Sequence, residues 1–275
     1  MVMSEVLTGV PLGQASPYIN QYQPDLLFPI ARSRQREALG ITDTLPFQGY
    51  DYWRAFELSW LDQRGKPQVA IGELYFPCAS PNLIESKSLK LYFNSFNNSQ
   101  FADWAKVQAL INQDLTAAAG APVQVVLKPV TQADVLVADL PGQLLDNLPV
   151  ACDRFLPHPD YLHCSDAVVQ ETLHSHLLKS NCLVTGQPDW ASVLIQYYGR
   201  QINAEGLLKY IISFRDLQGF HEQCVEHIFH DILQRCQPEN LTVHAFYTRR
   251  GGIDINSLRT TLDPKTFYDF RTIRQ

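Results

Sequence analysis

Apolar and polar side chains alternate along two runs of the chain that are separated by a polar turn. In residues 53–60, successive side chains change between the two sets as they do on opposite faces of a β-strand. The second run extends from residue 68 to residue 76, and the intervening residues 62–67 read Asp-Gln-Arg-Gly-Lys-Pro. Because Gly and Pro favour turns, the pattern predicts a β-hairpin.

A different period follows the hairpin. Over residues 101–115, large apolar side chains recur every three or four positions, which predicts one apolar helix face. Residues 122–130 read as a short strand after Gly120. Residues 1–50 are rich in Gln, Pro and Ser and have little periodicity, so we interpret them as an extended arm with one short helical turn.

The order of elements repeats in the second half of the chain. A connector dense in Pro, Cys and His, residues 148–166, precedes the second set. We predict strands over residues 170–184, 192–198 and 241–248, and helices over residues 207–214 and 221–233. The pairs Lys90/Lys209 and Phe101/Phe220 are both 119 residues apart. The repeated order indicates an internal duplication with close packing between the halves.

Length, charge and cysteine content narrow the class of protein. The 275 residues with 45% hydrophobic content suffice for one large domain or two small ones. The net charge of −6 disfavours direct binding to nucleic acid or an anionic membrane, since both attract a basic surface. Residues 1–14 do not resemble a secretory signal, and no apolar run has the length of a membrane span. We therefore expect a cytoplasmic protein whose six cysteines are reduced.

One cysteine lies in a setting that suits chemistry. Cys182 follows a strand-like run, and the turn-rich sequence Thr-Gly-Gln-Pro separates it from Asp189. A thiolate attacks electrophilic carbon, and a neighbouring carboxyl can deliver the proton that the attack requires. The same segment is also compatible with a buried structural cysteine, because a free thiol is only slightly ionised at neutral pH.

Three further segments carry groups that could bind a ligand, and each has a simpler structural explanation. Residues 85–92 place Lys87 and Lys90 on one helix face beside an acid and a hydroxyl, which suits phosphate or a solvated amphipathic helix. The carboxylate of Glu222, next to His221, could accept two donors from a guanine-like edge or complement a helix start. Residues 249–254 read Arg-Arg-Gly-Gly-Ile-Asp, which suits phosphate or a charged turn.

Histidine and glycine patterns argue against other cofactor sites. The pairs His174/His176 and His227/His230, and His163 beside Cys164, do not form a His-Glu-x-x-His or paired-cysteine pattern, so no metal is expected. No Gly-x-Gly-x-x-Gly sequence and no P-loop occur. A nicotinamide cofactor would therefore not be held by a Rossmann fingerprint.

Taken together, the four segments resemble the NADPH-dependent 7-cyano-7-deazaguanine reductases, the QueF nitrile reductases of queuosine biosynthesis. Residues 85–92 match the family motif at all eight positions, and the other three segments match in the same order. The resemblance extends from about residue 45 to the end and is to the long, two-module form. It implies an α+β fold of two tandem tunnelling-fold modules, with antiparallel sheets backed by helices. The implied division is an arm over residues 1–44 and modules over residues 45–147 and 148–275.

The resemblance also implies the site. Cys182 and Asp189 would be catalytic. The implied substrate-binding residues are Ile84, Glu85, Ser86, His221 and Glu222. The implied NADPH-binding residues are Ser86, Lys87, Lys90, Arg250 and Gly251. No metal is implied.

The motifs are divided between the halves. At the positions that correspond to residues 85–87 in the repeat, the second half has Ala204-Glu205-Gly206. At the positions that correspond to residues 221–222, the first half has Ala102-Asp103. Because each half has kept a different part of one site, we expect the active site to form between halves. The family further implies a homodimer.

The implied reaction takes the nitrile of a deazapurine to a primary amine with two NADPH, for tRNA modification. Cys182 would form a covalent thioimide while Asp189 protonates the nitrogen, and after a first hydride the thiolate would leave an imine for the second reduction. The site must be enclosed, because water could hydrolyse the imine.

Three alternatives stay open at this stage. A cysteine amidase or another cysteine hydrolase would use Cys182 without a phosphate-binding set. A zinc cyclohydrolase is possible on the same fold. A non-catalytic ring-binding or tRNA-associated module would lack a reactive thiol, although the acidic charge disfavours tRNA contact.

Overall fold

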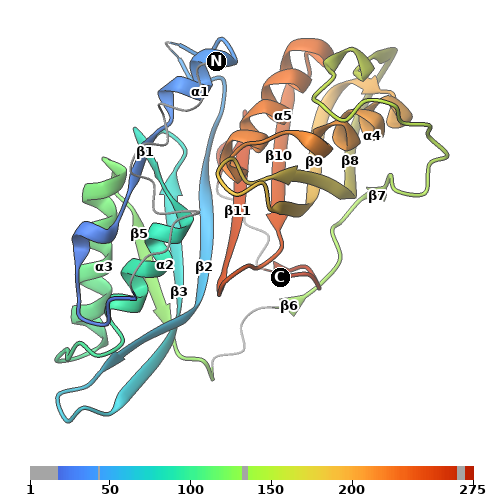
Figure 1. Cartoon of the computed structure of the whole chain (residues 1–275). Helices are drawn as coiled ribbons and strands as arrows, with labels where there is room; N and C mark the ends of the chain where they lie inside the picture. Colours follow the sequence, from blue (N-terminus) through green and yellow to red (C-terminus); the bar gives the residue numbers. More distant parts are fainter. Residues whose placement is uncertain (1–17, 43, 132–135, 265–269) are drawn as a thin grey trace. The chain divides into compact units, whose positions relative to one another are not determined.

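The computed structural model describes residues 18–42, 44–131, 136–264 and 270–275. The chain divides into two compact units, each assembled from separate segments (Figure 1). Unit 1 comprises Met1–Arg34, Tyr52–Asp134 and Arg250–Ile253. Unit 2 comprises Gln35–Asp51, Val135–Arg249 and Asp254–Gln275. The arm and module boundaries expected from the sequence stay a prediction.

The sheet of unit 1 contains the predicted hairpin. Its strands are β2 (Gln48–Leu61), β3 (Pro67–Pro77) and β5 (Gln124–Lys128), in the order β5-β3-β2. Strands β3 and β5 run antiparallel. Successive side chains of a strand point to opposite faces, and β2 has buried residues on both: Trp53 and Ala55 on one face and Arg54 on the other, each at most 2% exposed. The predicted strand is therefore covered on both faces over part of its length.

Two helices lie against this sheet, α2 (Ser86–Ser95) and α3 (Trp104–Ala119). The side chain of Asp103 caps the start of α3, and Gly120 ends the helix in the left-handed conformation with φ of 71°. Four side chains spaced three or four residues apart form the buried face of α3: Val107, Ile111, Leu115 and Ala119. The predicted amphipathic helix is confirmed. The short strands β1 (Pro29–Ala31) and β4 (Asn82–Ile84), which were not predicted, pair antiparallel.

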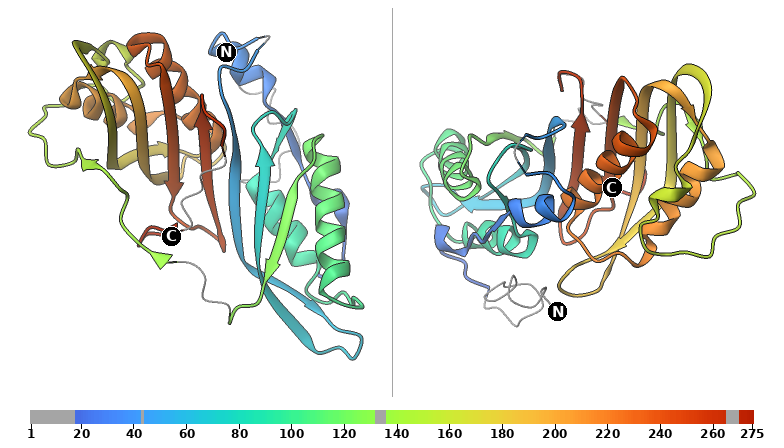
Figure 2. Two further views of the ribbon diagram at one scale, coloured as in Figure 1. Left: turned by 180° about the vertical axis from the view of Figure 1, so that it is seen from behind. Right: turned by 90° about the horizontal axis from the view of Figure 1, so that it is seen from above.

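Unit 2 has the larger sheet, seen from behind in Figure 2. Its strands are β7 (Gln143–Leu144), β8 (Cys164–Asn181), β9 (Pro188–Ile202), β10 (Asn240–Tyr247) and β11 (Ile253–Thr260), in the order β11-β10-β9-β8-β7. The pairs β8–β9, β9–β10 and β10–β11 are antiparallel, and β7 pairs with β8 in parallel. Two short strands, β6 (Leu136–Val137) and β12 (Phe270–Arg271), form a separate parallel pair.

Helices α4 (Ala204–Ser213) and α5 (His221–Cys236) cover one face of the sheet of unit 2 (Figures 1 and 2). Both helices were predicted at these places. The short helical segments of the chain are α1 (Ser33–Ala38), η3 (Pro159–Tyr161), which precedes α4, η4 (Phe214–Asp216), which follows it, and η2 (Pro24–Leu26), which belongs to unit 1. The α+β class, with antiparallel sheets backed by helices, is confirmed. Among the residues that the structure describes, no helix combines the length and apolar character needed to cross a membrane.

The two helix pairs repeat the same internal contacts. The Tyr92 hydroxyl donates to Asp114 at 2.6 Å, and the Tyr210 hydroxyl donates to Asp231 at 2.7 Å. The tyrosines are 118 residues apart and the aspartates 117. The spacing of 119 used above is therefore wrong by one or two residues. Each helix pair keeps its own register because each tyrosine is matched to its own aspartate.

This register corrects four pairings, the first of which is Phe101/Phe220: Phe220 is the N-cap of α5 and corresponds to Asp103, the N-cap of α3. Lys90 corresponds to Leu208 and not to Lys209, and Glu85 corresponds to Asn203, the residue that caps α4. At the start of the second helix of each pair, residues 221–222 correspond to Trp104-Ala105 and not to Ala102-Asp103.

A buried ion network fixes α5 within unit 2. Glu226 accepts hydrogen bonds from Arg36 at 2.7 Å and 2.9 Å and from Arg259 at 2.8 Å and 3.0 Å. Arg259 also pairs with Asp51 at 2.9 Å. Buried charges are stable only when they are paired, so this network restrains the helix whose first turn carries residues 221–222.

Candidate active site

The loop that carries Cys182 is a closed turn between β8 and β9. The Cys182 amide donates to the Gln187 carbonyl at 2.9 Å, and the Gly186 amide donates to the Cys182 carbonyl at 3.0 Å. Gly186 has φ of 67°, a conformation that glycine adopts without strain. Cys182 itself is 6% exposed. The turn therefore holds the thiol in a defined, largely buried position.

The residue before the thiol connects this turn to the start of α5. The Asn181 amide donates to the Leu217 carbonyl at 2.8 Å, and the Gly219 amide donates to the Asn181 carbonyl at 3.0 Å. The Asn181 side-chain amide also donates to the Arg215 carbonyl at 3.2 Å. Residues 215–219 are thereby attached to the end of β8. Helix α5 begins two residues later, which places its first turn next to the cysteine loop.

Asp189 and His221 face each other in unit 2. The His221 Nε2 atom lies 3.4 Å from Asp189 Oδ1, and the Asp189 side chain is 2% exposed. The ring of Tyr247 meets the His221 ring edge-on at a centroid distance of 4.1 Å. A buried carboxyl in contact with a partly exposed imidazole can exchange protons between the interior and the surface.

A second thiol, which sequence reasoning missed, lies among these groups. Cys224 is 1% exposed. Burial raises its pKa to about 12; the neighbouring side chains of Ser180 and Tyr247 oppose that rise, and the charge of Asp189 adds to it. Cys224 therefore remains a neutral thiol across the physiological range. The only signal in the sequence is its place on the apolar face of a predicted helix, which is also where a core residue would lie.

Glu222 occupies the first turn of α5 and is 2% exposed. The Phe220 amide just before it donates to the Gln223 side chain at 2.9 Å. A carboxylate is stabilised near a helix N-terminus by the helix dipole. Its charge also raises the pKa of Cys224, so the two side chains are neighbours. Glu222 is thus a buried acceptor adjoining the thiol and acid cluster.

The other predicted residues lie in unit 1, around the start of α2. Glu85 is fully buried, and its two carboxylate oxygens accept from the Lys87 amide at 2.7 Å and the Ser88 amide at 2.8 Å. Burial raises the pKa of Glu85, while the two amides and the charges of Lys90 and Lys87 oppose that rise. Glu85 is therefore the N-cap of α2, whatever else it binds.

A cavity of about 300 Å³ in unit 1 contains two of the predicted cofactor-binding residues. Lys90 and Gly251 line it together with Glu57, Asn94 and six other residues of the same unit. A β-carbon built on Gly251 would lie 3.1 Å from Lys90 Nζ. The absence of a side chain at residue 251 therefore keeps the ammonium group accessible. The Glu57 carboxylate in the same cavity would disfavour a phosphate placed against it.

The predicted residues therefore form two groups. Cys182, Asp189, His221 and Glu222 belong to unit 2. Seven others belong to unit 1: Ile84, Glu85, Ser86, Lys87, Lys90, Arg250 and Gly251. Ile84 is 2% exposed and pairs through its backbone with Pro29. The described residues contain no group of three or more His, Cys, Asp or Glu side chains arranged to hold a metal ion.

Comparison with known proteins gives concordant matches along the chain. Residues 18–127 match the family described as nitrile reductase, 7-cyano-7-deazaguanine-reductase N-term, and residues 188–266 match the family described as QueF-like protein. The NADPH-dependent 7-cyano-7-deazaguanine reductase of Dechloromonas aromatica is 56% identical over 96% of this chain and 95% of its own length.

Two further relatives carry the same name. The Verminephrobacter eiseniae protein is 54% identical over 96% of this chain and 98% of its own length, and the Desulfotalea psychrophila protein is 50% identical over 97% and 98%. Among solved structures, the apo form of an archaeosine synthase QueF-Like aligns with a TM-score of 0.30 at 17% identity, covering 35% of this chain and 94% of that one.

Proposed function

The chain belongs to the family of NADPH-dependent 7-cyano-7-deazaguanine reductases, and on that premise we propose that it reduces the nitrile of 7-cyano-7-deazaguanine to the aminomethyl group through a covalent intermediate on Cys182. The observation that carries this proposal is the arrangement in unit 2: the turn that holds the buried Cys182 leads into the strand that carries the buried Asp189, and Asp189 faces His221, which precedes the buried Glu222. The homodimeric state, the cytoplasmic location and the place in queuosine biosynthesis remain parts of the proposal.

Cys182 is suited to be the nucleophile because the turn restrains its backbone and the site around it is largely closed to water. Addition of the thiol to the nitrile forms a carbon–sulfur bond and leaves a C=N–H group, so the proton of the S–H ends on nitrogen. Asp189 is assigned as the group that delivers a proton to the nitrogen, and His221, 3.4 Å away, as the group that passes the S–H proton back to Asp189, so that one proton moves in all and both groups end as they began. The resulting thioimide accepts hydride more readily than a nitrile does.

Glu222 is assigned to recognition of the deazaguanine ring. The ring presents an N–H and an amino group side by side, and a carboxylate can accept both. A buried acceptor left without such donors would be costly, so the site would strongly prefer a ring that offers them. His221 precedes Glu222 and is assigned to the same ring. The assignment of Ile84, Glu85 and Ser86 to the substrate rests on the family resemblance.

Residues of unit 1 fit the phosphates of NADPH. Lys90 and Gly251 line the cavity described above, and Lys87 and Arg250 supply two more cations in the same unit. Lysine and arginine are common ligands of phosphate, and glycine permits close approach of the backbone. When bound, NADPH supplies the hydrides that take the nitrile to the amine. The cavity holds only part of a dinucleotide, because its volume is about 300 Å³.

The test is the intact mass of the protein after mixing with 7-cyano-7-deazaguanine in the absence of NADPH. We expect a mass increase equal to the whole ligand, complete loss of the adduct in Cys182→Ala, and retention in Cys224→Ala. The second variant is the matched control, because it removes the other buried thiol of the cluster. A stable adduct in Cys182→Ala, or none in the folded and reduced wild type, would refute the proposed intermediate. Release of ammonia without NADPH would favour an amidase.

A further inference from the structure

Residues 272–275 form a turn that buries one polar side chain in unit 2. The Gln275 amide donates to the Thr272 carbonyl at 3.1 Å, and the Thr272 amide donates to the Gln275 side-chain oxygen at 3.0 Å. Gln275 is 7% exposed, whereas Ile273 is 85% exposed. This reverses the usual preference of the two residue types, so the burial of Gln275 calls for an explanation. Gln275 belongs to none of the motifs assigned to nitrile reduction.

The buried side chain of Gln275 joins two strands of the sheet. Its Nε2 group donates to the Tyr247 carbonyl of β10 at 3.2 Å and to the Asn256 side-chain oxygen of β11 at 2.5 Å. The Asn256 side-chain nitrogen donates in turn to the Asp254 carboxylate at 2.6 Å, and this contact fixes which end of each amide group is the donor. The nitrogen and the oxygen of the Gln275 side chain therefore both have partners, as a buried amide group requires.

The neighbouring side chain, Arg274, binds the strand next to β10. Its guanidinium group donates to the Ala191 carbonyl of β9 at 3.0 Å, to the His176 carbonyl at 3.0 Å and to the Ser192 hydroxyl at 3.2 Å. Ala191 is the residue that pairs with Tyr247 between β9 and β10. Consecutive residues of the turn thus hold both members of one strand pair.

The turn and His221 lie on opposite faces of the sheet of unit 2. Phe270, which leads into the turn, stacks on Phe246 of β10 with a ring-centroid distance of 5.7 Å. The next residue, Tyr247, points to the other face, because consecutive side chains of a strand alternate. There its ring meets the His221 ring edge-on at 4.1 Å. The turn can therefore act on the histidine through the strand.

The paired residues Ala191 and Tyr247 support both sides of the contact between Asp189 and His221. Asp189 precedes Ala191 by two residues on β9, so both side chains point to the same face. His221 packs against Tyr247, and its Nε2 atom lies 3.4 Å from Asp189 Oδ1. This distance is near the longest that a hydrogen bond allows. A small displacement of either strand would therefore open the contact.

We propose that Arg274 and Gln275 are positioning residues, which fix the backbone at Ala191 and Tyr247 and thereby keep the Asp189–His221 pair in the geometry that proton transfer to the nitrile nitrogen requires. The inference rests on the function proposed above, since it concerns the same proton transfer. Displacement of a reacting group by about 1 Å can lower a rate by about 100-fold. The two residues should therefore affect the rate of thioimide formation far more than the affinity for the nitrile.

The test measures how fast the thioimide forms. The full chain is mixed with a saturating concentration of 7-cyano-7-deazaguanine without NADPH, quenched at successive times and analysed by intact mass. We expect Gln275→Ala to lower the rate constant by about 10- to 100-fold. The affinity for the nitrile, measured by calorimetry in a Cys182→Ala background, should be unchanged by the same substitution. A general disturbance of unit 2 would lower both.

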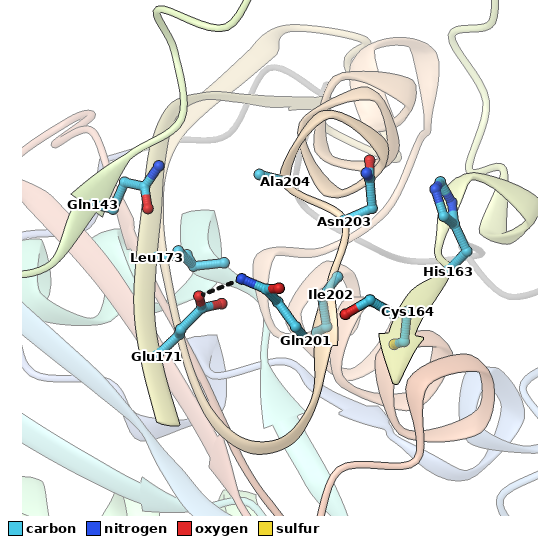
Figure 3. A pocket seen from close by; sticks show the side chains of 10 residues that line it. Gln143, His163, Cys164, Glu171, Leu173, Gln201, Ile202, Asn203 and Ala204 are labelled. Carbon is cyan, nitrogen blue, oxygen red and sulfur yellow. Dashed lines mark hydrogen bonds between the residues drawn. The ribbon is translucent and has the colours of Figure 1, made fainter. Parts of the chain in front are cut away.

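Gln201→Ala is the matched control. Gln201 is another glutamine of unit 2 whose side chain donates to a neighbouring strand, to Glu171 at 3.2 Å. Figure 3 shows this hydrogen bond at the wall of a cavity of about 410 Å³. Gln201 lies at the end of β9, whereas Asp189 lies at its start. Loss of the Gln201 side chain should therefore leave the rate of thioimide formation unchanged.

Arg274→Ala provides a second variant, because Arg274 is exposed and its replacement should leave the protein folded. We expect it to slow the same step, since the backbone at Ala191 loses its hydrogen bond to the turn. Ile273→Ala is the control for this variant, because it changes the exposed side chain next to Arg274. It should form the adduct as fast as wild type.

A double variant separates positioning from stability. In a His221→Ala background, Gln275→Ala should slow the step no further, because the group through which Gln275 acts is gone. An equal fold-loss in both backgrounds, a wild-type rate in Gln275→Ala and Arg274→Ala, or the same loss in Gln201→Ala would overturn the inference. Absence of the adduct in folded wild type would refute the proposed function, and this inference with it.

Discussion

The helix pair α2/α3 of unit 1 and the helix pair α4/α5 of unit 2 agree in their interior and differ at their ends. In both pairs a tyrosine donates to an aspartate of the partner helix, at 2.6 Å and 2.7 Å. In both, a serine three residues later donates to the tyrosine carbonyl at 2.6 Å. A phenylalanine then meets the tyrosine ring edge-on, at 5.1 Å in one pair and 5.3 Å in the other.

The residues assigned to chemistry lie where this agreement fails. Glu85 caps α2 where Asn203 caps α4, and Lys90 lies in a cavity where Leu208 is 1% exposed. On the second helix, Glu222 stands where α3 has Ala105. The shared positions are those that packing requires, because a close-packed interior tolerates little change. The divergent positions are not constrained by packing between the helices. Each unit carries its candidate site residues at a different subset of these positions.

The largest expected effect comes from giving α2 the cap of α4. Glu85→Asn keeps a side-chain acceptor for the helix amides, so the free energy of unfolding should change by no more than about 1 kcal/mol. If Glu85 also binds the substrate, loss of the carboxylate should weaken nitrile binding by about 10- to 100-fold, because hydrogen bonds to charged groups are the stronger ones. Calorimetric titration with the nitrile measures this.

The matched control is Asn203→Glu, which gives α4 the cap of α2. It should leave nitrile affinity unchanged, since Asn203 is exposed and belongs to no motif of the family. Unchanged affinity in Glu85→Asn would make Glu85 a helix cap and nothing more.

The next effect tests the shared interior. Tyr92→Phe and Tyr210→Phe each remove the donor to a carboxylate of the partner helix, and each should lower the free energy of unfolding by about 1–3 kcal/mol. Each aspartate keeps other contacts, because Tyr22 donates to Asp114 at 2.8 Å, and His227 and His230 lie 3.3 Å and 3.7 Å from Asp231. Urea titration of both variants gives the comparison. If only one variant lost free energy of unfolding, the tyrosine–aspartate hydrogen bond would stabilise only one of the two helix pairs.

The sequence predicted the helices of both pairs. It did not predict which residue of one pair corresponds to which residue of the other. Hydrophobic periodicity predicted α3, α4, α5 and the β2–β3 hairpin, because a strongly amphipathic helix or strand can be recognised from its own sequence. The register of the repeat depends on which tyrosine contacts which aspartate. Contacts between side chains of two helices cannot be recognised in the hydrophobic periodicity of either helix. The pairing of Lys90 with Lys209 was wrong for that reason.

The candidate site residues that the sequence predicted in unit 2 lie at a turn and at a helix start, and their assignment to the site stays a prediction. Cys182 and Asp189 flank a turn-rich sequence, and His221 and Glu222 begin a predicted helix. Both features can be recognised in the local sequence. Cys224 was missed because a cysteine on an apolar helix face looks like any small core residue. The pairing of Arg36 with Glu226 was missed because those residues are 190 positions apart.

A smaller effect is expected from replacing Cys224 with its counterpart on α3, which is Val107. Burial raises the pKa of Cys224 from its ordinary value to about 12, so the folded state holds a proton that the unfolded state releases near pH 9. Stability therefore falls as pH rises from about 9 to 12, because the unfolded state binds fewer protons there. Cys224→Val should flatten that part of the profile of Tm against pH. An unchanged slope would mean that the thiol titrates alike in both states.

The smallest expected effect concerns the cap of α4. The Asn203 side chain accepts from the Gly206 amide at 2.8 Å, and Asn203 is exposed. Asn203→Ala leaves that amide to water and should lower the free energy of unfolding by about 1 kcal/mol. Asn203→Asp is the matched control, which keeps the acceptor, adds a charge favourable at a helix N-terminus, and should preserve stability. Urea titration distinguishes the two. An equal loss of free energy of unfolding in both variants would show that the asparagine NH2 group, and not its oxygen, stabilises this end of α4. The cap of α4 would then differ from that of α2, in which the Glu85 side chain offers only oxygens.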